Sequence, residues 1–273
     1  MLSWREVGAG SPLHCHPGGP GCSSPYFGAL PELAADHMLL MLDPRGTGGS
    51  DRPAESSRYD LEDYAADIEA VREHLGLERL DVLGHSHGGF VAMTWGGTYP
   101  DRVDRLVLAG TAPRFTDVIR RLRRDRVASH RGEPYFDDAI AALQDQQAGK
   151  YANDDDLLAL YERAGPVLAP PDADIAPVAD AFRTAGINAD AMRHFNENIA
   201  GTMDLRPLLG RIGRPTLVLA GEHDAFGGVT TDEIAQALPD PTVVTIPGAD
   251  HFAYLEPEIR VPWSRAVLDF LAR

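Results

Sequence analysis

Short apolar runs alternate along the chain with longer segments of helical periodicity. Residues 37–42, 80–83 and 105–109 are almost wholly apolar, which is typical of strands buried on both faces of a parallel sheet. Residues 59–75 place apolar side chains at helical spacing, and Gly76 follows as a helix stop. Strands alternating with helices imply right-handed crossovers, so the pattern predicts an α/β fold with a mostly parallel, doubly wound sheet.

The same alternation opens and closes the chain. Strands are expected at 2–7 and 13–16, and a helix is expected at 25–35. Towards the C-terminus we expect strands at 216–220 and 242–246 and helices at 231–238 and 259–271.

The middle of the chain is helical throughout, with almost no β-branched runs. Helices are expected at 116–126, 135–147, 155–163 and 189–199, and four prolines interrupt 164–177. We therefore predict a core made of 1–113 and 205–273. A helical cap, 114–204, is inserted into this core after the strand that follows the serine motif described below, counted as the sixth strand of the fold. Five arginines between positions 120 and 126 are interpreted as a solvated helix face that pairs with the cap's own carboxylates.

The composition of the chain argues against several classes of function. The 273 residues carry a formal net charge of -16, which argues against nucleic acid and against charge-driven docking on anionic membranes. No signal peptide and no apolar run of membrane-spanning length is visible, so a cytoplasmic protein is expected. Cys15 and Cys22, the two cysteines, are expected to be free thiols. Composition leaves the oligomeric state open.

Residues 84–88 read Gly-His-Ser-His-Gly between a predicted strand and a helix expected to start at Phe90. A serine on such a sharp strand-to-helix turn needs strained backbone angles and flanking glycines, because a Cβ there would collide with the strand or the helix. The turn also points helix N-terminal N–H groups at whatever the serine attacks. We therefore predict that Ser86 is a nucleophile.

A serine nucleophile needs a base and a carboxylate that orients it, both placed at the carboxyl ends of strands. The chain order in this architecture is serine, acid, histidine. Asp224 follows the predicted strand 216–220, and His251 follows 242–246. Asp250 and Glu222 are rival acids, but Asp250 adjoins His251 and Glu222 points away from Asp224. We assign the predicted triad to Ser86, His251 and Asp224.

Acyl transfer also needs two N–H donors aimed at the developing oxyanion. One is expected from the backbone of His87, directly after the nucleophile. The other is expected from Gly18 or Gly19, in the glycine-rich loop 16–21 after the second strand. Both donors are backbone groups, so the prediction depends on loop shape.

The serine motif, Asp224 and His251 in this order, together with the cap, resemble the α/β-hydrolase superfamily over the whole chain except a shortened N-terminal hairpin. Residues 18–21 (Gly-Gly-Pro-Gly) and 43–50 (Asp-Pro-Arg-Gly-Thr-Gly-Gly-Ser) resemble the H-G-G-P-G and D-x-R-G-x-G-x-S motifs of the proline iminopeptidase branch. The resemblance implies release of an N-terminal residue from short peptides. It also implies cap glutamates that hold the substrate's amine, and Gly19 as the loop's oxyanion donor.

Two positions depart from that branch. Pro17 stands where the branch has histidine, and His85 and His87 flank the serine as in general esterases and ring-opening hydrolases. Glu197 is the best match for an amine-holding glutamate, and Glu162 is a weaker one.

Further contacts are expected around these residues. Gly18, His85 and Glu197 are assigned to substrate binding. Asp43 and Arg45 are interpreted as a buried pair that shapes its loop.

Three functions follow as hypotheses. The first is cleavage of an amide at the N-terminus of a short peptide, and the second is the same machinery acting on an ester or lactone. A buried carboxylate facing Ser86 distinguishes them, because only a free-amine pocket requires one. The third, a non-catalytic binding protein, has no need of all three triad residues. The histidines do not share a metal-ligand spacing, so no metal and no cofactor are expected, and the partner is a small molecule or short peptide.

Overall fold

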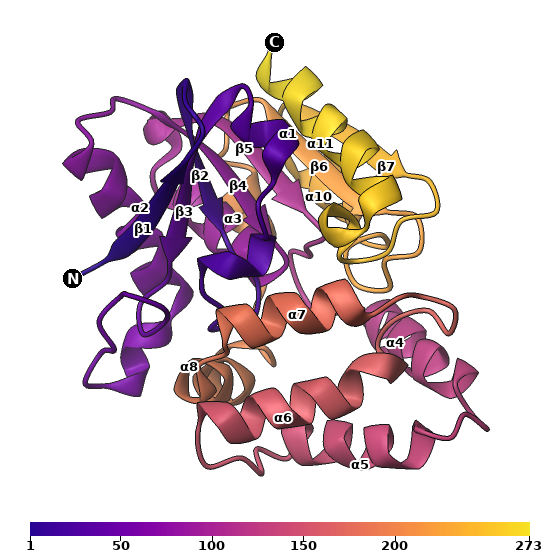
Figure 1. Cartoon of the computed structure of the whole chain (residues 1–273). Coiled ribbons are helices and arrows are strands. Elements are labelled where there is room, and N and C mark those ends of the chain that lie inside the picture. The colour runs from indigo at the N-terminus through magenta and orange to yellow at the C-terminus, as the bar shows by residue number, and fades with distance from the viewer.

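The computed structural model describes all 273 residues and contains one seven-stranded sheet (Figure 1). Its strands are β1 (Ser3–Val7), β2 (Ser11–His16), β3 (His37–Asp43), β4 (Leu80–His85), β5 (Val103–Ala109), β6 (Thr216–Gly221) and β7 (Pro241–Ile246). The order across the sheet is β1-β3-β2-β4-β5-β6-β7, and only β1 runs antiparallel to its neighbour. The mostly parallel sheet predicted from the sequence is confirmed.

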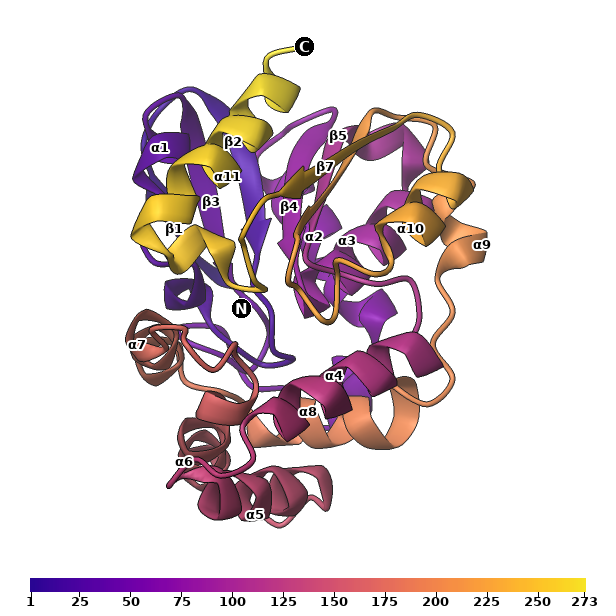
Figure 2. The ribbon, with the colours of Figure 1, turned by 90° about the vertical axis from the view of Figure 1, so that its right-hand side faces the viewer.

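Helices cover both faces of the sheet (Figure 2). One face carries α2 (Leu61–His74), α3 (His87–Thr98), α9 (Arg206–Leu209) and α10 (Thr231–Ala237), and the other carries α1 (Pro31–Ala34) and α11 (Pro257–Leu271). Successive residues of β3 enter different cores: Leu39 packs in the cluster that contains Val267, whereas Leu40 packs in the cluster that contains Ile68. Burial on both faces explains why this strand is apolar at nearly every position.

The cap comprises α4 (Asp117–Ser129), α5 (Phe136–Gln147), α6 (Asp154–Ala164), α7 (Ala176–Ala185) and α8 (Ala189–His194). These helices lie together below the sheet, at the end to which the parallel strands point (Figures 1 and 2). The chain leaves the core after β5, the fifth strand of this chain rather than the sixth. Where the chain returns, the N–H of Leu205 donates to the carbonyl of Pro113 over 2.8 Å.

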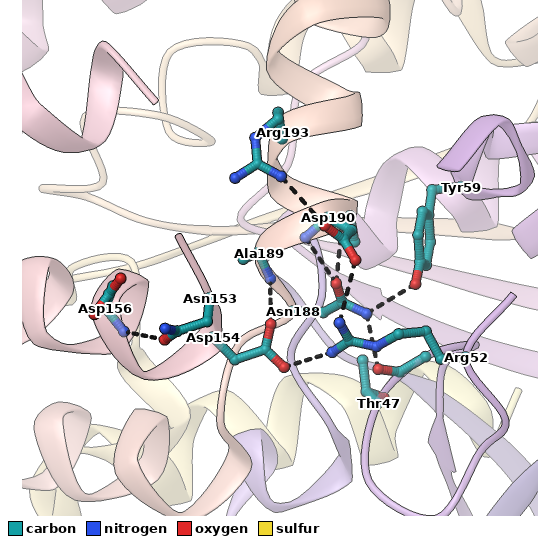
Figure 3. Close-up of polar contacts among 12 residues, drawn as sticks. Thr47, Arg52, Tyr59, Asn153, Asp154, Asp156, Asn188, Ala189, Asp190 and Arg193 are labelled. Atoms are coloured by element: carbon teal, nitrogen blue, oxygen red, sulfur yellow. Dashed lines mark hydrogen bonds and ion pairs between the residues drawn. The ribbon is translucent and has the colours of Figure 1, made fainter. Parts of the chain in front are cut away.

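Arg52, in the loop after β3, joins the core to the cap (Figure 3). Its guanidinium pairs with Asp154 at the start of α6 and with Asp190 in the first turn of α8. All three side chains are between 42% and 45% exposed, so solvent weakens these pairs.

Asn188, also drawn in Figure 3, is a buried contact between the cap and both glycine-rich loops. Its side-chain amide donates to the carbonyl of Gly46 and to the hydroxyl of Tyr59, at 2.8 and 2.9 Å. Its side-chain oxygen caps α8, and its backbone N–H donates to the carbonyl of Gly21. One residue therefore ties 18–21 and 43–50 to the cap.

Several local predictions were wrong. The helix expected at 25–35 is divided into the turn η1 (Ser24–Phe27) and α1, because Gly28 and Leu30 have positive φ angles of 63° and 42°. Helix α3 begins at His87, and α7 was not predicted at all. The helix expected at 189–199 ends at His194 and continues as the π-helical turn η5 (Phe195–Ile199).

Asp43 and Arg45 do not pair with each other, contrary to the prediction. The carboxylate of Asp43 accepts backbone N–H groups of Ser24 and Gly49, whereas Arg45 pairs with Asp67 at 2.7 Å. Each residue therefore fixes its loop through a different partner.

The remaining elements are four short 3-10 turns: η2 (Ser56–Tyr59), η3 (Pro100–Arg102), η4 (Gly165–Val167) and η6 (Ala253–Leu255). Cys15 and Cys22 are free and buried, as predicted. None of the helices is both long enough and apolar enough to cross a bilayer.

Candidate active site

Ser86 lies on the turn between β4 and α3, with φ 56° and ψ −118°. A non-glycine residue in this region carries backbone strain that the surroundings must hold. Two hydrogen bonds do so: the N–H of Ser86 donates to the carbonyl of Ala109, and its carbonyl accepts from the hydroxyl of Thr111 over 2.8 Å.

The flanking glycines are required by close backbone approach. A Cβ on Gly84 would lie 2.2 Å from the carbonyl oxygen of Gly88, and one on Gly88 would lie 2.1 Å from the carbonyl oxygen of His16. Real Cβ atoms do not approach so closely, so the steric argument made from the sequence is confirmed.

Asp224 and His251 lie beside each other after β6 and β7. Nδ1 of His251 is 3.0 Å from Oδ2 of Asp224, and Oδ1 of Asp224 accepts the backbone N–H of Phe226 at 2.8 Å. Burial raises the pKa of the Asp224 carboxyl, but the charge of His251 and these hydrogen bonds outweigh burial and lower it overall. Burial acts to lower the pKa of His251, and the Asp224 carboxylate reverses this and raises it above 6.5.

The two rival carboxylates have other partners. Asp250 forms an ion pair with Arg126 at 2.9 Å, and Glu222 accepts the backbone N–H of Gly248. Of the three acids considered from the sequence, only Asp224 is within hydrogen-bond distance of His251.

Ser86 and His251 face one cavity of about 440 Å³ between the core and the cap. The core contributes Gly19, Pro20, Tyr26, Ser86, His87, Asp224, His251 and Phe252, and the cap contributes Arg123, Arg126, Gln146, Tyr161, Glu162, Phe182, Met192 and Phe195 among others. No hydrogen bond joins the side chains of Ser86 and His251. Serine, histidine and carboxylate thus meet at one apolar-walled cavity.

Two backbone N–H groups remain available at this cavity. Those of Gly19 and His87 donate to no other group in the chain, and both residues line the cavity with Ser86. Gly18 does not line the cavity. A Cβ at Gly18 would lie 3.2 Å from the Cβ of Ser86 and 2.3 Å from the hydroxyl of Tyr26, so this glycine allows close packing against Ser86 and Tyr26.

The assignment of His85 to substrate binding is not supported by its position. His85 is buried outside the cavity lining, and both of its ring nitrogens are occupied. Nε2 lies 2.8 Å from the carbonyl of His251, so it must carry the proton and donate. Nδ1 therefore accepts from the hydroxyl of Tyr26, also at 2.8 Å. His85 holds the backbone of His251 rather than a substrate.

Glu197 is also placed differently from the prediction. It is exposed on η5 and does not line the cavity, although its neighbour Asn196 does. Glu162 lines the cavity, but Arg183 pairs with it at 2.9 Å. The five arginines of α4 follow the prediction in part: Arg120 pairs with a cap carboxylate, whereas Arg126 pairs with Asp250 of the core.

Two aromatic residues of the cavity were missed from the sequence. Tyr161 of α6 and Phe182 of α7 stack with their ring centroids 5.5 Å apart and form a wall of the cavity. The apolar spacing at Val178, Ala181 and Phe182 follows Pro177, which suits the first turn of a helix. That spacing was the available signal for α7.

Comparison with known proteins agrees with this architecture. Residues 11–258 match the family described as alpha/beta hydrolase fold. The chain is 29% identical to a 2-(acetamidomethylene)succinate hydrolase of Mesorhizobium japonicum, in a match that covers 99% of the chain and 91% of that relative. It is 27% identical to a proline iminopeptidase of Lactiplantibacillus plantarum, which covers 90% of the chain and 87% of the relative.

Among solved structures, an enol-lactonase from Burkholderia xenovorans superposes with a TM-score of 0.68 at 25% identity, covering 100% of this chain and 96% of that one. The proline iminopeptidase branch remains one that the chain resembles, and the matched family spans both glycine-rich loops, the serine turn and the residues after β6 and β7. The chain belongs to the α/β-hydrolase fold family.

Proposed function

We propose that this chain is a serine hydrolase in which Ser86 attacks the carbonyl carbon of a small-molecule ester or lactone. The observation that carries the proposal is the 3.0 Å contact between His251 and Asp224 at the cavity that Ser86 also lines. The family's members named above, a succinate-derivative hydrolase, a peptidase and a lactonase, are all hydrolytic enzymes, which supports the reaction class.

The proposed mechanism assigns one role to each group. His251, oriented through Nδ1 by Asp224, takes the proton of Ser86 on Nε2 as the serine oxygen bonds to the carbonyl carbon. The free N–H groups of Gly19 and His87 stabilise the oxyanion. The protonated His251 then gives its proton to the departing alkoxide, leaving an acyl-enzyme. Water, deprotonated by His251, releases the acid and restores Ser86.

The charges of the cavity favour an ester or lactone over the N-terminal amide of a peptide. A substrate ammonium would need a carboxylate that no other cation neutralises. The carboxylates in the lining are Glu162, Asp224 and Asp250. Glu162 and Asp250 are each paired with an arginine at 2.9 Å, and Asp224 is hydrogen-bonded to His251 at 3.0 Å, so none is free to hold an ammonium group. The cap glutamate expected from the proline iminopeptidase resemblance has no unpaired counterpart here.

The test compares p-nitrophenyl acetate with proline p-nitroanilide. We expect turnover of the ester, and we expect Ser86→Ala to reduce kcat by at least about a thousandfold because the nucleophile is lost. Thermal unfolding of Ser86→Ala should match the wild type within about 1 kcal/mol, which separates loss of chemistry from loss of fold. Preferred turnover of the anilide, with a KM that rises in Glu162→Gln, would instead support the peptidase.

A further inference from the structure

Arg123 is the one charged side chain of the cavity lining without an opposite charge beside it. The carboxylates of the lining and their partners form three pairs, and Arg126 belongs to one of them. Arg123 lines the cavity but is exposed overall, as is its neighbour Arg124, and it forms neither an ion pair nor a hydrogen bond in the chain. The chain holds 41 acidic against 25 basic residues, so an unpaired arginine is not explained by a shortage of carboxylates.

Arg123 lines the same cavity as Ser86 and His251. Helix α4 crosses beneath the carboxyl ends of the strands (Figure 2), and Arg126, one turn further along, reaches the loop residue Asp250. Burial raises the pKa of Tyr161, and the charge of Arg123 opposes that rise. The same charge opposes the rise in the pKa of His251. The charge of Arg123 therefore affects both Tyr161 in the cap and His251 in the core.

An arginine is suited to a carboxylate partner. Its planar guanidinium presents paired N–H donors that match the two oxygens of a carboxylate. Just over half of the lining residues are hydrophobic, among them Phe182, and apolar surface strengthens a charge pair once a ligand displaces water from the cavity. The cavity thus offers an apolar surface, a nucleophile and one unneutralised cation.

We propose that the substrate carries a free carboxylate in addition to its ester or lactone bond, and that Arg123 is the residue that selects it. This inference rests on the proposed function, since it names the substrate class for the same site. It makes Arg123 a specificity residue outside the triad, contributed by the cap.

The kinetic test uses two esters that differ only in charge: mono-p-nitrophenyl adipate and the same compound with its free carboxyl group capped as a methyl ester. We expect kcat/KM of the wild type to be at least about tenfold higher for the acid, the range of a charge-assisted contact in a partly solvated site. Arg123→Ala should remove this preference by lowering kcat/KM for the acid alone. Arg123→Lys should keep part of it, since the charge stays and the fork is lost.

Arg124→Ala is the matched control. Arg124 lies on the same helix, is exposed, has no ion pair and does not line the cavity, so its loss should change neither ester. The assignment would be overturned if Arg123→Ala lowered kcat/KM equally for both esters. It would also be overturned if Arg124→Ala lowered kcat/KM for the acid as much as Arg123→Ala does.

Binding separates a failure of this inference from a failure of the proposed function. Adipate and its neutral analogue adipamide contain no ester, so calorimetry of the wild type with each is independent of turnover. We expect adipate to bind at least about tenfold more tightly, and Arg123→Ala to abolish the difference. Equal binding of the two overturns the inference even if esters are hydrolysed. If adipate binds more tightly than adipamide but no ester is hydrolysed, the proposed function is wrong and the inference about Arg123 stands.

Discussion

Asp224 acts on His251 through both a hydrogen bond and a charge, and the two effects have separate consequences. The hydrogen bond places the proton on Nδ1 of His251, so Nε2 is left as an acceptor. The charge, working against burial, raises the pKa of His251 above 6.5. A histidine acts as a base only when it is unprotonated. The raised pKa therefore keeps His251 protonated, and unable to act as a base, up to a higher pH.

We therefore expect kcat/KM for a neutral ester to fall as the pH is lowered, with a midpoint above 6.5. Asp224→Asn should move this midpoint to lower pH, because it removes the main effects that oppose burial at His251, and should reduce kcat by roughly 10⁴-fold through the wrong tautomer. The pH profile of kcat/KM for both proteins is the measurement. A midpoint that stays in place in Asp224→Asn would show that Asp224 does not set the protonation of His251.

The sequence allowed the prediction of residues whose role depends on chain order and steric fit. Ser86 could be predicted from its flanking glycines, and Asp224 and His251 from the ends of their strands. Glu197 and His85 were misassigned, because what a side chain faces depends on tertiary packing. That Arg123 has no ion-pair partner could not be predicted either, since pairing depends on which neighbouring carboxylates contact which arginines.

Among the elements, apolar strands and helices with clear periodicity were predicted well, whereas elements next to prolines or to unusual backbone angles were not. Helix α2 and strands β3 and β6 lie within a few residues of their expected bounds. Helix α7 was missed because prolines before it suggested a loop, although they end where the helix begins. The break between η1 and α1 depends on the left-handed Leu30, which no local sequence rule indicates.

The junction of α8 with the core provides a prediction at this scale. Asn188→Ala removes the cap of α8 and leaves the buried Tyr59 hydroxyl and Gly46 carbonyl without their partner. We expect this change to lower the free energy of unfolding by about 2–3 kcal/mol. Arg52→Ala removes two exposed ion pairs at the same junction and should cost less than about 1 kcal/mol. Urea unfolding of both variants measures the difference, and equal losses would mean that the exposed pairs, not Asn188, fasten the cap.

At the scale of the whole molecule, the central region of the fold encloses four histidines in their neutral form. Burial lowers the pKa to about 3 for His14, His85 and His87 and to about 4 for His16. Both ring nitrogens of His14, and Nε2 of His16 and of His87, have no hydrogen-bond partner. His14 and His16 belong to β2, which pairs with β4, His85 ends β4, and His87 directly follows Ser86. Because these histidines are buried around the candidate site, protonating them lowers the stability of the fold.

That burial predicts a steep loss of stability in acid. Below pH 6.5 the unfolded chain binds protons on these four histidines while the folded chain does not, until the pH approaches 4. The free energy of unfolding must therefore fall as the pH falls through this window. Each histidine contributes about 1.4 kcal/mol per pH unit, so the four together give roughly 5 kcal/mol per unit.

Urea unfolding at several pH values between 7 and 5 measures this slope. His14→Leu removes one histidine whose ring nitrogens bind nothing, so it should flatten the slope by about a quarter without breaking a hydrogen bond. His223→Gln is the control, because His223 is exposed and its replacement should leave the slope unchanged. A slope unaffected by His14→Leu would show that burial of His14 does not contribute to the acid sensitivity. The expected outcome means that the fold buries neutral imidazoles around its serine at the expense of stability in acid.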